Sequence, residues 1–452
     1  MLSRRGFLKV ASFFGVSSWF SAKAHSPEVE EFQEIDLEEP EYHIRFANHE
    51  IRVLQGATDS TSTVLTILAH REARLKIEVL DSSGRLLSAN VQTVDMQLNE
   101  FILHHVYVQN LRVGETYFLD LLHRGVGQFH RRRFKALDLQ NPETRIALLT
   151  CSSHRSADPK DVMFGRFREA RPDVVFFAGD LVYANSSLDT VLGQPAEPHE
   201  AYNVYVKTWM ELDLYNLEDL LPVFTTWDDH DLAFNNAKFD HPNKDIMLKM
   251  FRSFYPVTAQ IKSLKLGPGI SFCLEGFGLQ IFFLDNRHFK NPKAQQMLGR
   301  DQVAWIAKTL KTSDQPIVLI SSLQFLHYRS FTESFQRNAE SEFLELRNHL
   351  RSTGRPVLFI SGDVHYSQIQ TLDASWVGHP TYEVTSSAFF SLSARSYGKR
   401  SVRDGQLEYY GYPNFLLMDK ISSTTKSLDF QLTCLSERSR TQFQRALAIK
   451  VP

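Results

Sequence analysis

Hydrophobic and polar residues alternate in short runs from about Tyr42 to Leu137. These runs include STVLTILAH, RLKIEVLD, FILHHVYVQNL and ETYFLDLLH, and the turn signals DSSG and RVG separate some of them. Alternation with a period of two predicts strands that bury one face. Several such strands in succession predict a small antiparallel β-sandwich, over residues 42–138. This segment contains no group of side chains that suggests catalysis.

The pattern changes from Arg145 onward, where continuous apolar runs alternate with helical patterns. The apolar runs are RIALLTC, DVVFFAGD, PVFTTWDDH, LQIFFLDNR, PIVLISS and PVLFISGD. Continuous apolar runs of this length predict strands that are buried on both faces, as in an α/β domain. We expect this domain to span residues 144–440 and a short basic tail to follow over 441–452. The helical patterns between the strands are Asp161–Ala170, Ala201–Trp209, Asp301–Leu310 and Ser341–Leu350.

The N-terminus, MLSRRGFLKVASFFGVSSWFSAKA, combines a charged start, an apolar stretch and an A-x-A cleavage pattern. This order is typical of a secretory signal peptide, and an amphipathic first helix is the alternative interpretation. Residues 3–9, SRRGFLK, resemble a twin-arginine export signal. We therefore expect residues 1–24 to be a twin-arginine signal peptide that binds the twin-arginine export machinery.

An acidic segment that contains prolines follows at residues 25–41 and is expected to be a solvated linker. The apolar stretch from Val10 to Phe20 is short and contains serines, and no later stretch is long enough to span a bilayer. The mature protein is therefore expected to have no stable membrane span and to be periplasmic or secreted.

Charge and cysteine content narrow the class of protein further. The formal net charge of −2 and the pI near 6.8 give no electrostatic indication of nucleic-acid binding. The basic cluster at residues 130–133 is interpreted as a solvated strand edge or linker. The three cysteines are an odd number, so at least one thiol has no intramolecular disulfide partner.

Polar and metal-ligating residues follow almost every apolar run of the second domain. In open α/β sheets, ligands bind at the carboxyl ends of the strands. Each residue alone has a structural alternative: a turn, a helix cap, a buried thiol or a core histidine. Three carboxylates around one imidazole, in WDDHD, repel each other unless a cation is present. The joint pattern predicts a metal site from residues at six strand ends: Cys151, Asp180 with Tyr183, Asp228–Asp231, Asp285 with Arg287, Gln324, and Asp363 with His365.

The ordered motifs TCSSHR, FFAGDLVYAN, LPVFTTWDDHDLAFNN, FFLDNRHF, MLGRDQVAWI, ISSLQFL and LFISGDVHYSQI resemble the PhoD-like alkaline phosphatases. That family belongs to the wider metallophosphoesterases. The resemblance covers about Gln55 to the end of the chain and implies a sandwich of two mixed β-sheets flanked by helices. The run VYVQNLRVGETYFLDLL looks like the late strands of a fibronectin III module. A small fibronectin III/Ig-like β-sandwich is therefore expected to precede the catalytic domain.

The resemblance also implies a ferric ion and one or more calcium ions. A phenolate and a thiolate suit an oxidised transition metal better than magnesium. We assign the iron to Cys151, Asp180, Tyr183 and His365.

Oxygen ligands suit calcium at the second site, with Asp180 as the bridge. Asp229 and Asp363 are the expected further ligands, and Asn236 is an additional candidate. In related two-metal phosphatases the places of Asp363 and Asp229 are held by histidine and asparagine, so the carboxylates favour calcium over zinc. Other divalent metals, such as zinc or manganese, remain an alternative there.

The expected reaction is hydrolysis of small-molecule phosphate monoesters, and of some diesters, by attack of a metal-bound hydroxide. His230 would stabilise the phosphate or protonate the leaving alkoxide. Arg155 and Arg287 would contact the phosphate or brace the metal ligands. Two alternatives stay open. One is a phosphodiesterase or phospholipase D-like enzyme that acts on phospholipids or cell-envelope polymers, and the other is a non-catalytic, calcium-stabilised binding protein.

Overall fold

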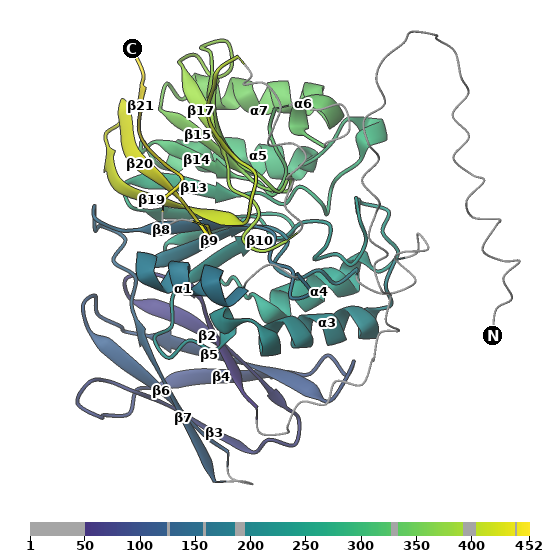
Figure 1. Ribbon diagram of the computed structural model, residues 1–452, viewed down its shortest axis with the longest axis vertical. Helices are drawn as coiled ribbons and strands as arrows, with labels where there is room; N and C mark the ends of the chain where they lie inside the picture. The colour runs from purple at the N-terminus through teal and green to yellow at the C-terminus, as the bar shows by residue number, and fades with distance from the viewer. Residues whose placement is uncertain are drawn as a thin grey trace, which may run out of the picture. The chain divides into compact units, whose positions relative to one another are not determined.

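The computed structural model (Figure 1) describes residues 50–123, 127–156, 160–185, 195–326, 333–391, 404–438 and 441–452. All of them belong to one compact unit that spans Glu41–Pro452. The predicted signal peptide and acidic linker lie outside the described residues. Within these residues, no helix is both long enough and apolar enough to cross a membrane.

The first seven strands form two antiparallel sheets. One has the order β1 (Arg52–Thr58), β2 (Ser62–His70), β5 (Phe101–Gln109) and β4 (Ala89–Val94). The other has the order β3 (Leu75–Leu80), β6 (Thr116–His123) and β7 (Gln128–Lys135). Because successive side chains of a strand alternate between its two faces, each sheet offers one apolar face. A shared buried cluster joins these faces and includes Val53, Leu65, Val106, Leu119 and Leu121.

A six-stranded mixed sheet follows, with parallel strands at one side and antiparallel strands at the other. Its order is β10 (Val223–Thr226), β9 (Val174–Ala178), β8 (Ile146–Leu149), β19 (Asn414–Ser423), β20 (Ser427–Ser436) and β21 (Phe443–Lys450). Segment 441–452 therefore differs from the expected basic tail, because β21 pairs with β20 throughout its length. Its Phe443, Leu447 and Ile449 are buried in the core between the sheets.

The third sheet has eight strands and is also mixed. Its order is β11 (Leu264–Leu266), β12 (Phe272–Gly276), β13 (Leu279–Phe283), β14 (Ile317–Ile320), β15 (Val357–Ser361), β17 (Thr381–Thr385), β16 (Ser367–Leu372) and β18 (Gln406–Tyr410). The pairs β13–β14, β14–β15 and β15–β17 are parallel, whereas β12–β13 and β16–β17 are antiparallel.

The two large sheets pack face to face and helices cover their outer faces (Figure 1). Phe176 and Phe224 of one sheet meet Phe283 and Ile320 of the other in one apolar cluster. This is the sandwich of two mixed sheets flanked by helices that the sequence predicts. Helices α1 (Lys160–Ala170), α3 (Pro198–Glu211) and α4 (Lys244–Phe254) cover the six-stranded sheet, and α5 (Gly299–Thr309) and α7 (Glu340–Ser352) cover the eight-stranded sheet.

Shorter helices complete the described part of the chain: α6 (Phe335–Asn338), η2 (Asp213–Tyr215), η3 (Pro292–Ala294) and η4 (Leu310–Thr312). One contact fixes α5 against α7. The buried carboxylate of Glu342 in α7 accepts hydrogen bonds from the N–H groups of Met297, Leu298 and Gly299. Gly299 is the first residue of α5 and Leu298 its N-cap, so these N–H groups lack partners within the helix.

Candidate metal centre

The predicted strand ends meet at one edge, where the parallel strands of both sheets end. Cys151 follows β8 and Asp180 follows β9, and the backbone N–H of Cys151 donates to Gly179 O at 3.2 Å. On the other sheet, the N–H of Gly362 after β15 donates to Ser322 O after β14 at 3.0 Å. The carboxyl ends of β8, β9, β10, β13, β14 and β15 thus supply the candidate residues, as expected for an α/β fold.

Glycine at position 362 allows these strand ends to approach each other. A Cβ atom there would lie 2.7 Å from Thr150 Cγ2 and 2.9 Å from Ala178 O. Both distances are shorter than van der Waals contact, so only glycine fits without movement of two strands. Gly362 therefore sets how closely Asp363 and His365 approach the strand ends of the other sheet.

Five of the seven expected metal ligands have a left-handed backbone, with φ between 53° and 69°. This conformation is uncommon for residues other than glycine and costs free energy at each position. Residues held in this way cluster at functional sites, where the surrounding structure compensates for the strain. The five residues are Cys151, Asp180, Asn236, Asp363 and His365.

One group of ligands is formed by Cys151, Asp180 and His365. One ligand atom from each lies within 4.8 Å of the others, and the Cys151 thiol donates to Asp180 Oδ2 at 3.6 Å. Tyr183 joins this group, since its hydroxyl lies 3.2 Å from His365 Nε2. These are the four residues that we assigned to iron, and the structure brings them together.

A second group is formed by Asp180, Asp229 and His230, again with ligand atoms within 4.8 Å. Asp180 is common to both groups, as a bridging ligand must be. His230, which we expected to be catalytic, therefore lies at a ligand position. Its Nδ1 is 2.8 Å from Asn185 Oδ1, and a donor at Nδ1 leaves the Nε2 lone pair available to a cation. The ring of His230 also stacks on Tyr183, with centroids 4.2 Å apart.

Asp363 and Asn236, the other two expected ligands of the second site, differ in their relation to Asp229. The Asp363 carboxyl lies close enough to Asp229 for their mutual repulsion to raise the pKa of Asp363. Asp363 is half-buried and belongs to neither three-residue group in the described part of the chain. The Asn236 side chain is exposed, and its backbone N–H donates to Asp229 Oδ2 at 2.6 Å. Asn236 therefore supports Asp229 through its backbone.

The two expected arginines differ strongly in burial. Arg155 is exposed in the turn after Ser152. Arg287 has a fully buried side chain, and its Nε donates to Asp228 Oδ1. Its Nη2 lies 3.8 Å from Asp229 Oδ2. Of the two roles expected for Arg287, the structure supports that of a brace for the carboxylates.

Asp285 and Asp231 are structural anchors of the loops around the site. Asp285 accepts hydrogen bonds from Trp227 Nε1 at 2.8 Å and from the Ile270 N–H at 3.0 Å. Asp231 accepts three backbone hydrogen bonds, from Asp180 at 2.8 Å, Val182 at 2.9 Å and Asp228 at 2.8 Å. The third carboxylate of WDDHD thus holds the β9 and β10 strand ends together.

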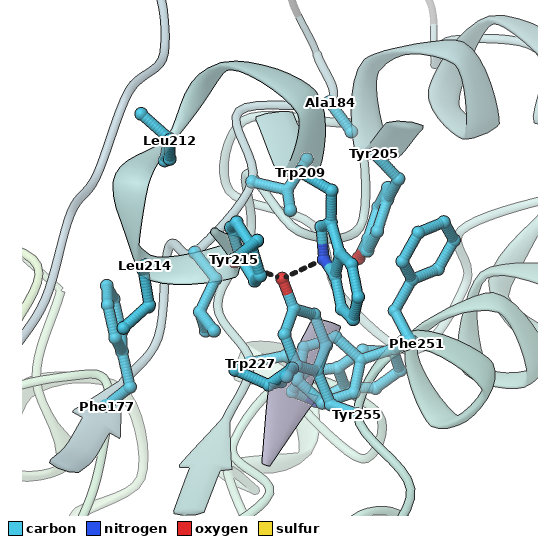
Figure 2. Close-up of a cluster of buried hydrophobic side chains, with 14 of the residues drawn as sticks. Phe177, Ala184, Tyr205, Trp209, Leu212, Leu214, Tyr215, Trp227, Phe251 and Tyr255 are labelled. Carbon is cyan, nitrogen blue, oxygen red and sulfur yellow. Dashed lines mark hydrogen bonds between the residues drawn. The ribbon is translucent and has the colours of Figure 1, made fainter. Parts of the chain in front are cut away.

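A buried aromatic cluster lies beside this loop (Figure 2). Tyr205 of α3 donates its hydroxyl to Asp231 O at 2.9 Å. The Tyr255 hydroxyl lies 2.7 Å from that of Tyr215 and accepts from Trp209 Nε1 at 3.1 Å. The polar atoms of the cluster are therefore satisfied, and α3 is connected directly to the WDDHD loop.

Three residues that contact the site were missed by the sequence analysis. Ser387 donates to Cys151 Sγ at 3.2 Å, and Ser391 donates to the Tyr183 hydroxyl at 3.1 Å. The third is Asn185, the partner of His230. Asn185 lies two residues after Tyr183, so its position in the motif could have indicated it. The serines belong to SSAFFSLS, where nothing in the sequence distinguishes them from turn residues.

Burial and mutual repulsion raise the pKa of Asp180 well above its usual value, through Asp228, Asp229, Asp231 and Asp363. The same two causes raise the pKa of Asp363. Burial, together with nearby negative charge, also raises the pKa values of the Cys151 thiol and the Tyr183 phenol. The anionic forms that these residues need as ligands are therefore unfavourable without a nearby positive charge.

Asp229 behaves differently from its neighbours. Burial by itself would raise its pKa, but Arg287, His230, the Asn236 N–H and Lys290 outweigh this and lower the pKa to about 2. Asp229 is therefore ionised at neutral pH and is available to a cation.

The residues present fit a pair of cations. Asp180 Oδ1 is buried and has no hydrogen-bond partner, although this carboxylate is the member common to both groups. A buried carboxylate oxygen without a partner is costly unless a cation or a donor satisfies it. The first group offers sulfur, phenol and imidazole donors, and the second offers carboxylates and an imidazole, which suit a transition metal and a divalent cation respectively.

A protein-family model described as PhoD-like phosphatase matches residues 146–410, which is more than half of the chain. The match confirms the resemblance that the strand-end motifs indicate, and it covers all seven expected metal ligands. No curated protein is significantly similar to the chain.

Proposed function

The chain belongs to the PhoD-like phosphatase family and is therefore a phosphoric ester hydrolase, and we propose that it hydrolyses phosphate monoesters and some diesters. PhoD-like phosphatases are metal-dependent, and the two ligand groups that share Asp180 agree with this requirement. The observation that carries the proposal is the position of Asp180, a buried carboxylate in both groups with one oxygen that lacks a partner.

In this proposal Cys151, Asp180, Tyr183 and His365 hold a ferric ion. Asp180 and Asp229 hold calcium or another divalent cation, with His230 or Asp363 as a further ligand. Cations held by these residues would supply positive charge that neutralises the phosphate and lowers the pKa of a water molecule.

The remaining residues position these ligands or meet the substrate. Asn185 holds the His230 ring through Nδ1, and Arg287 braces Asp229. Arg155 and the side chain of Asn236 are exposed and are the candidates for contacts with the ester.

The test combines elemental analysis with a Tyr183→Phe variant. A tyrosinate bound to Fe(III) should give a visible charge-transfer band, which Tyr183→Phe should remove together with most of the activity. Tyr215→Phe is the matched control, because Tyr215 is buried and its hydroxyl contacts that of Tyr255 in the aromatic cluster. Retention of both band and activity in Tyr183→Phe would contradict the assignment of iron. Absence of phosphate release with every metal supplied would instead favour a calcium-stabilised binding protein.

Substrate preference is tested by comparing turnover of an aryl phosphate monoester with that of the matching diester. Faster turnover of the monoester is expected. The opposite ranking would favour the alternative of a phosphodiesterase that acts on phospholipids or cell-envelope polymers.

We also propose that the N-terminal strands form a fibronectin III/Ig-like domain and that the twin-arginine pathway exports the protein to the periplasm or the medium. The motif SRRGFLK supports the second proposal. Replacement of Arg4 and Arg5 by lysine should keep the phosphatase in the cytoplasm, as measured by cell fractionation. Unchanged export of this variant would show that another route is used.

A further inference from the structure

A buried network of charged residues lies behind Asp229 and includes two residues outside the expected site, Lys290 and Glu333. Arg287 Nη1 lies 2.8 Å from Glu333 Oε2, and Lys290 Nζ lies 2.5 Å from Glu333 Oε1. The exposed fraction of the side chain is 0% for Arg287, 1% for Lys290 and 19% for Glu333. Charges buried to this extent are costly unless each is paired, and Glu333 pairs with both Arg287 and Lys290.

Within this network each nitrogen of the Arg287 guanidinium faces a different carboxylate, and Glu333 is the partner of Nη1. The guanidinium donates to Asp228 through Nε and lies against Glu333 through Nη1. Its Nη2 is 3.8 Å from Asp229 Oδ2, which is an ion-pair distance but too long for a hydrogen bond. Asp229 therefore has no side-chain hydrogen bond from Arg287. Its oxygens accept one backbone hydrogen bond each, from His230 at 2.9 Å and from Asn236 at 2.6 Å, which leaves a lone pair on each for a cation.

Lys290 holds Glu333 from the other side and also contacts the segment that supports Asp229. Lys290 Nζ donates to Asn236 O at 3.4 Å and lies 3.5 Å from Ala237 O. The N–H of Asn236 in turn donates to Asp229 Oδ2. Arg287 and Lys290 are therefore both connected to Asp229, Arg287 through its ion pair and Lys290 through the Asn236 backbone.

We propose that Glu333 and Lys290 are positioning residues that set the cation affinity of the Asp180–Asp229 group. Glu333 holds Arg287 away from Asp229 and offsets its positive charge, while Lys290 offsets part of the charge of Glu333. This inference rests on the proposed function, because it requires a cation at that group. Partners of this kind behind a metal ligand commonly change affinity by about 10- to 100-fold.

The experiment measures Ca²⁺ binding to the full chain by equilibrium dialysis after calcium has been removed with a chelator. Glu333→Gln should weaken binding by about 10- to 100-fold, because Arg287 is released towards Asp229. Lys290→Gln should bind Ca²⁺ more tightly than the wild type, since the charge of Glu333 is then less compensated. Glu340→Gln is the matched control, because Glu340 is exposed and lies in the same part of the chain. It should leave binding unchanged.

The double variant Glu333→Gln/Lys290→Gln separates an electrostatic role from a purely structural one. It restores the net charge of the network but still lacks the carboxylate that holds Arg287, so its affinity should lie between those of the two single variants. A purely structural role predicts weaker binding than in either single variant. Wild-type affinity in a folded Glu333→Gln protein would overturn the inference, as would weaker binding by Lys290→Gln. Absence of Ca²⁺ binding by the wild type would count against the proposed function itself.

Discussion

Tight packing at the strand ends places the candidate ligands, and Gly362 shows this most clearly. Gly362→Ala introduces a Cβ atom at 2.7 Å from Thr150 Cγ2 and 2.9 Å from Ala178 O. We expect a loss of about 1–3 kcal/mol in the free energy of unfolding, because strands of both sheets must move apart. Activity should fall further, since Asp363 and His365 follow directly. Chemical denaturation and an aryl phosphate assay measure the two effects.

The control for this prediction is Gly165→Ala. Gly165 lies inside α1, and a Cβ atom there meets nothing within 4 Å. Alanine should therefore stabilise the helix by about 0.5–1 kcal/mol. Equal destabilisation by both variants would contradict the role of Gly362 in the approach of the strand ends.

Asp231 gives a second prediction at the residue scale. Asp231→Ala leaves three buried backbone N–H groups without acceptors, those of Asp180, Val182 and Asp228. A buried unpaired donor costs about 1–3 kcal/mol, so a loss of about 3 kcal/mol or more is expected in chemical denaturation. Asp219→Ala, which removes an exposed ion pair with Arg133, should cost at most about 1 kcal/mol. Similar losses in both variants would show that Asp231 is not an anchor.

The sequence predicted which strand ends meet better than it predicted the role of each side chain there. The apolar runs and the polar residues after them indicated which segments meet, and the structure brings Cys151, Asp180, Tyr183 and His365 together. They did not indicate that His230 lies beside Asp180 and Asp229 at a ligand position. A left-handed backbone at Asp363 and His365 changes the direction of each side chain, and φ cannot be deduced from a period-two pattern.

At the scale of elements, strong periodicity made most strands and helices predictable. Each of the four predicted helices overlaps a helix in the structure: α1, α3, α5 or α7. The basic tail expected over residues 441–452 is instead strand β21. Its buried Phe443, Leu447 and Ile449 alternate with polar or small residues, which is the signal of an edge strand.

Removal of residues 441–452 tests the role of β21. The truncation exposes the apolar surface covered by Phe443, Leu447 and Ile449, so a loss of several kcal/mol is expected, with about 4–9 kcal/mol as an upper estimate. It also leaves β20 as an unprotected edge, which favours aggregation. Thermal unfolding and light scattering measure both effects. Removal of Pro452 alone should change neither, and a stable, monomeric truncated protein would support the interpretation as a tail.

At the scale of the whole molecule, the candidate centre brings together carboxylates from two sheets, and these carboxylates repel each other. Burial raises the pKa of Asp231 from 3.8 to about 8, and burial with mutual repulsion raises the pKa values of Asp180 and Asp363 well above their usual range. An acid whose pKa is higher in the folded state contributes stability at low pH and loses it as the pH rises through the raised pKa. The metal-free protein should therefore become less stable between about pH 4 and pH 8.

A cation at the centre should reverse this trend. Positive charge favours the ionised carboxylates, so the stabilisation by Ca²⁺ should be small near pH 5 and grow towards pH 8. Thermal unfolding of the chelator-treated protein, with and without Ca²⁺ across this range, measures the difference in Tm. Asp229 does not complicate the result, because its pKa of about 2 means that its contribution is lost only below this range. A Tm increase by Ca²⁺ that is independent of pH would mean that the ion binds away from these carboxylates.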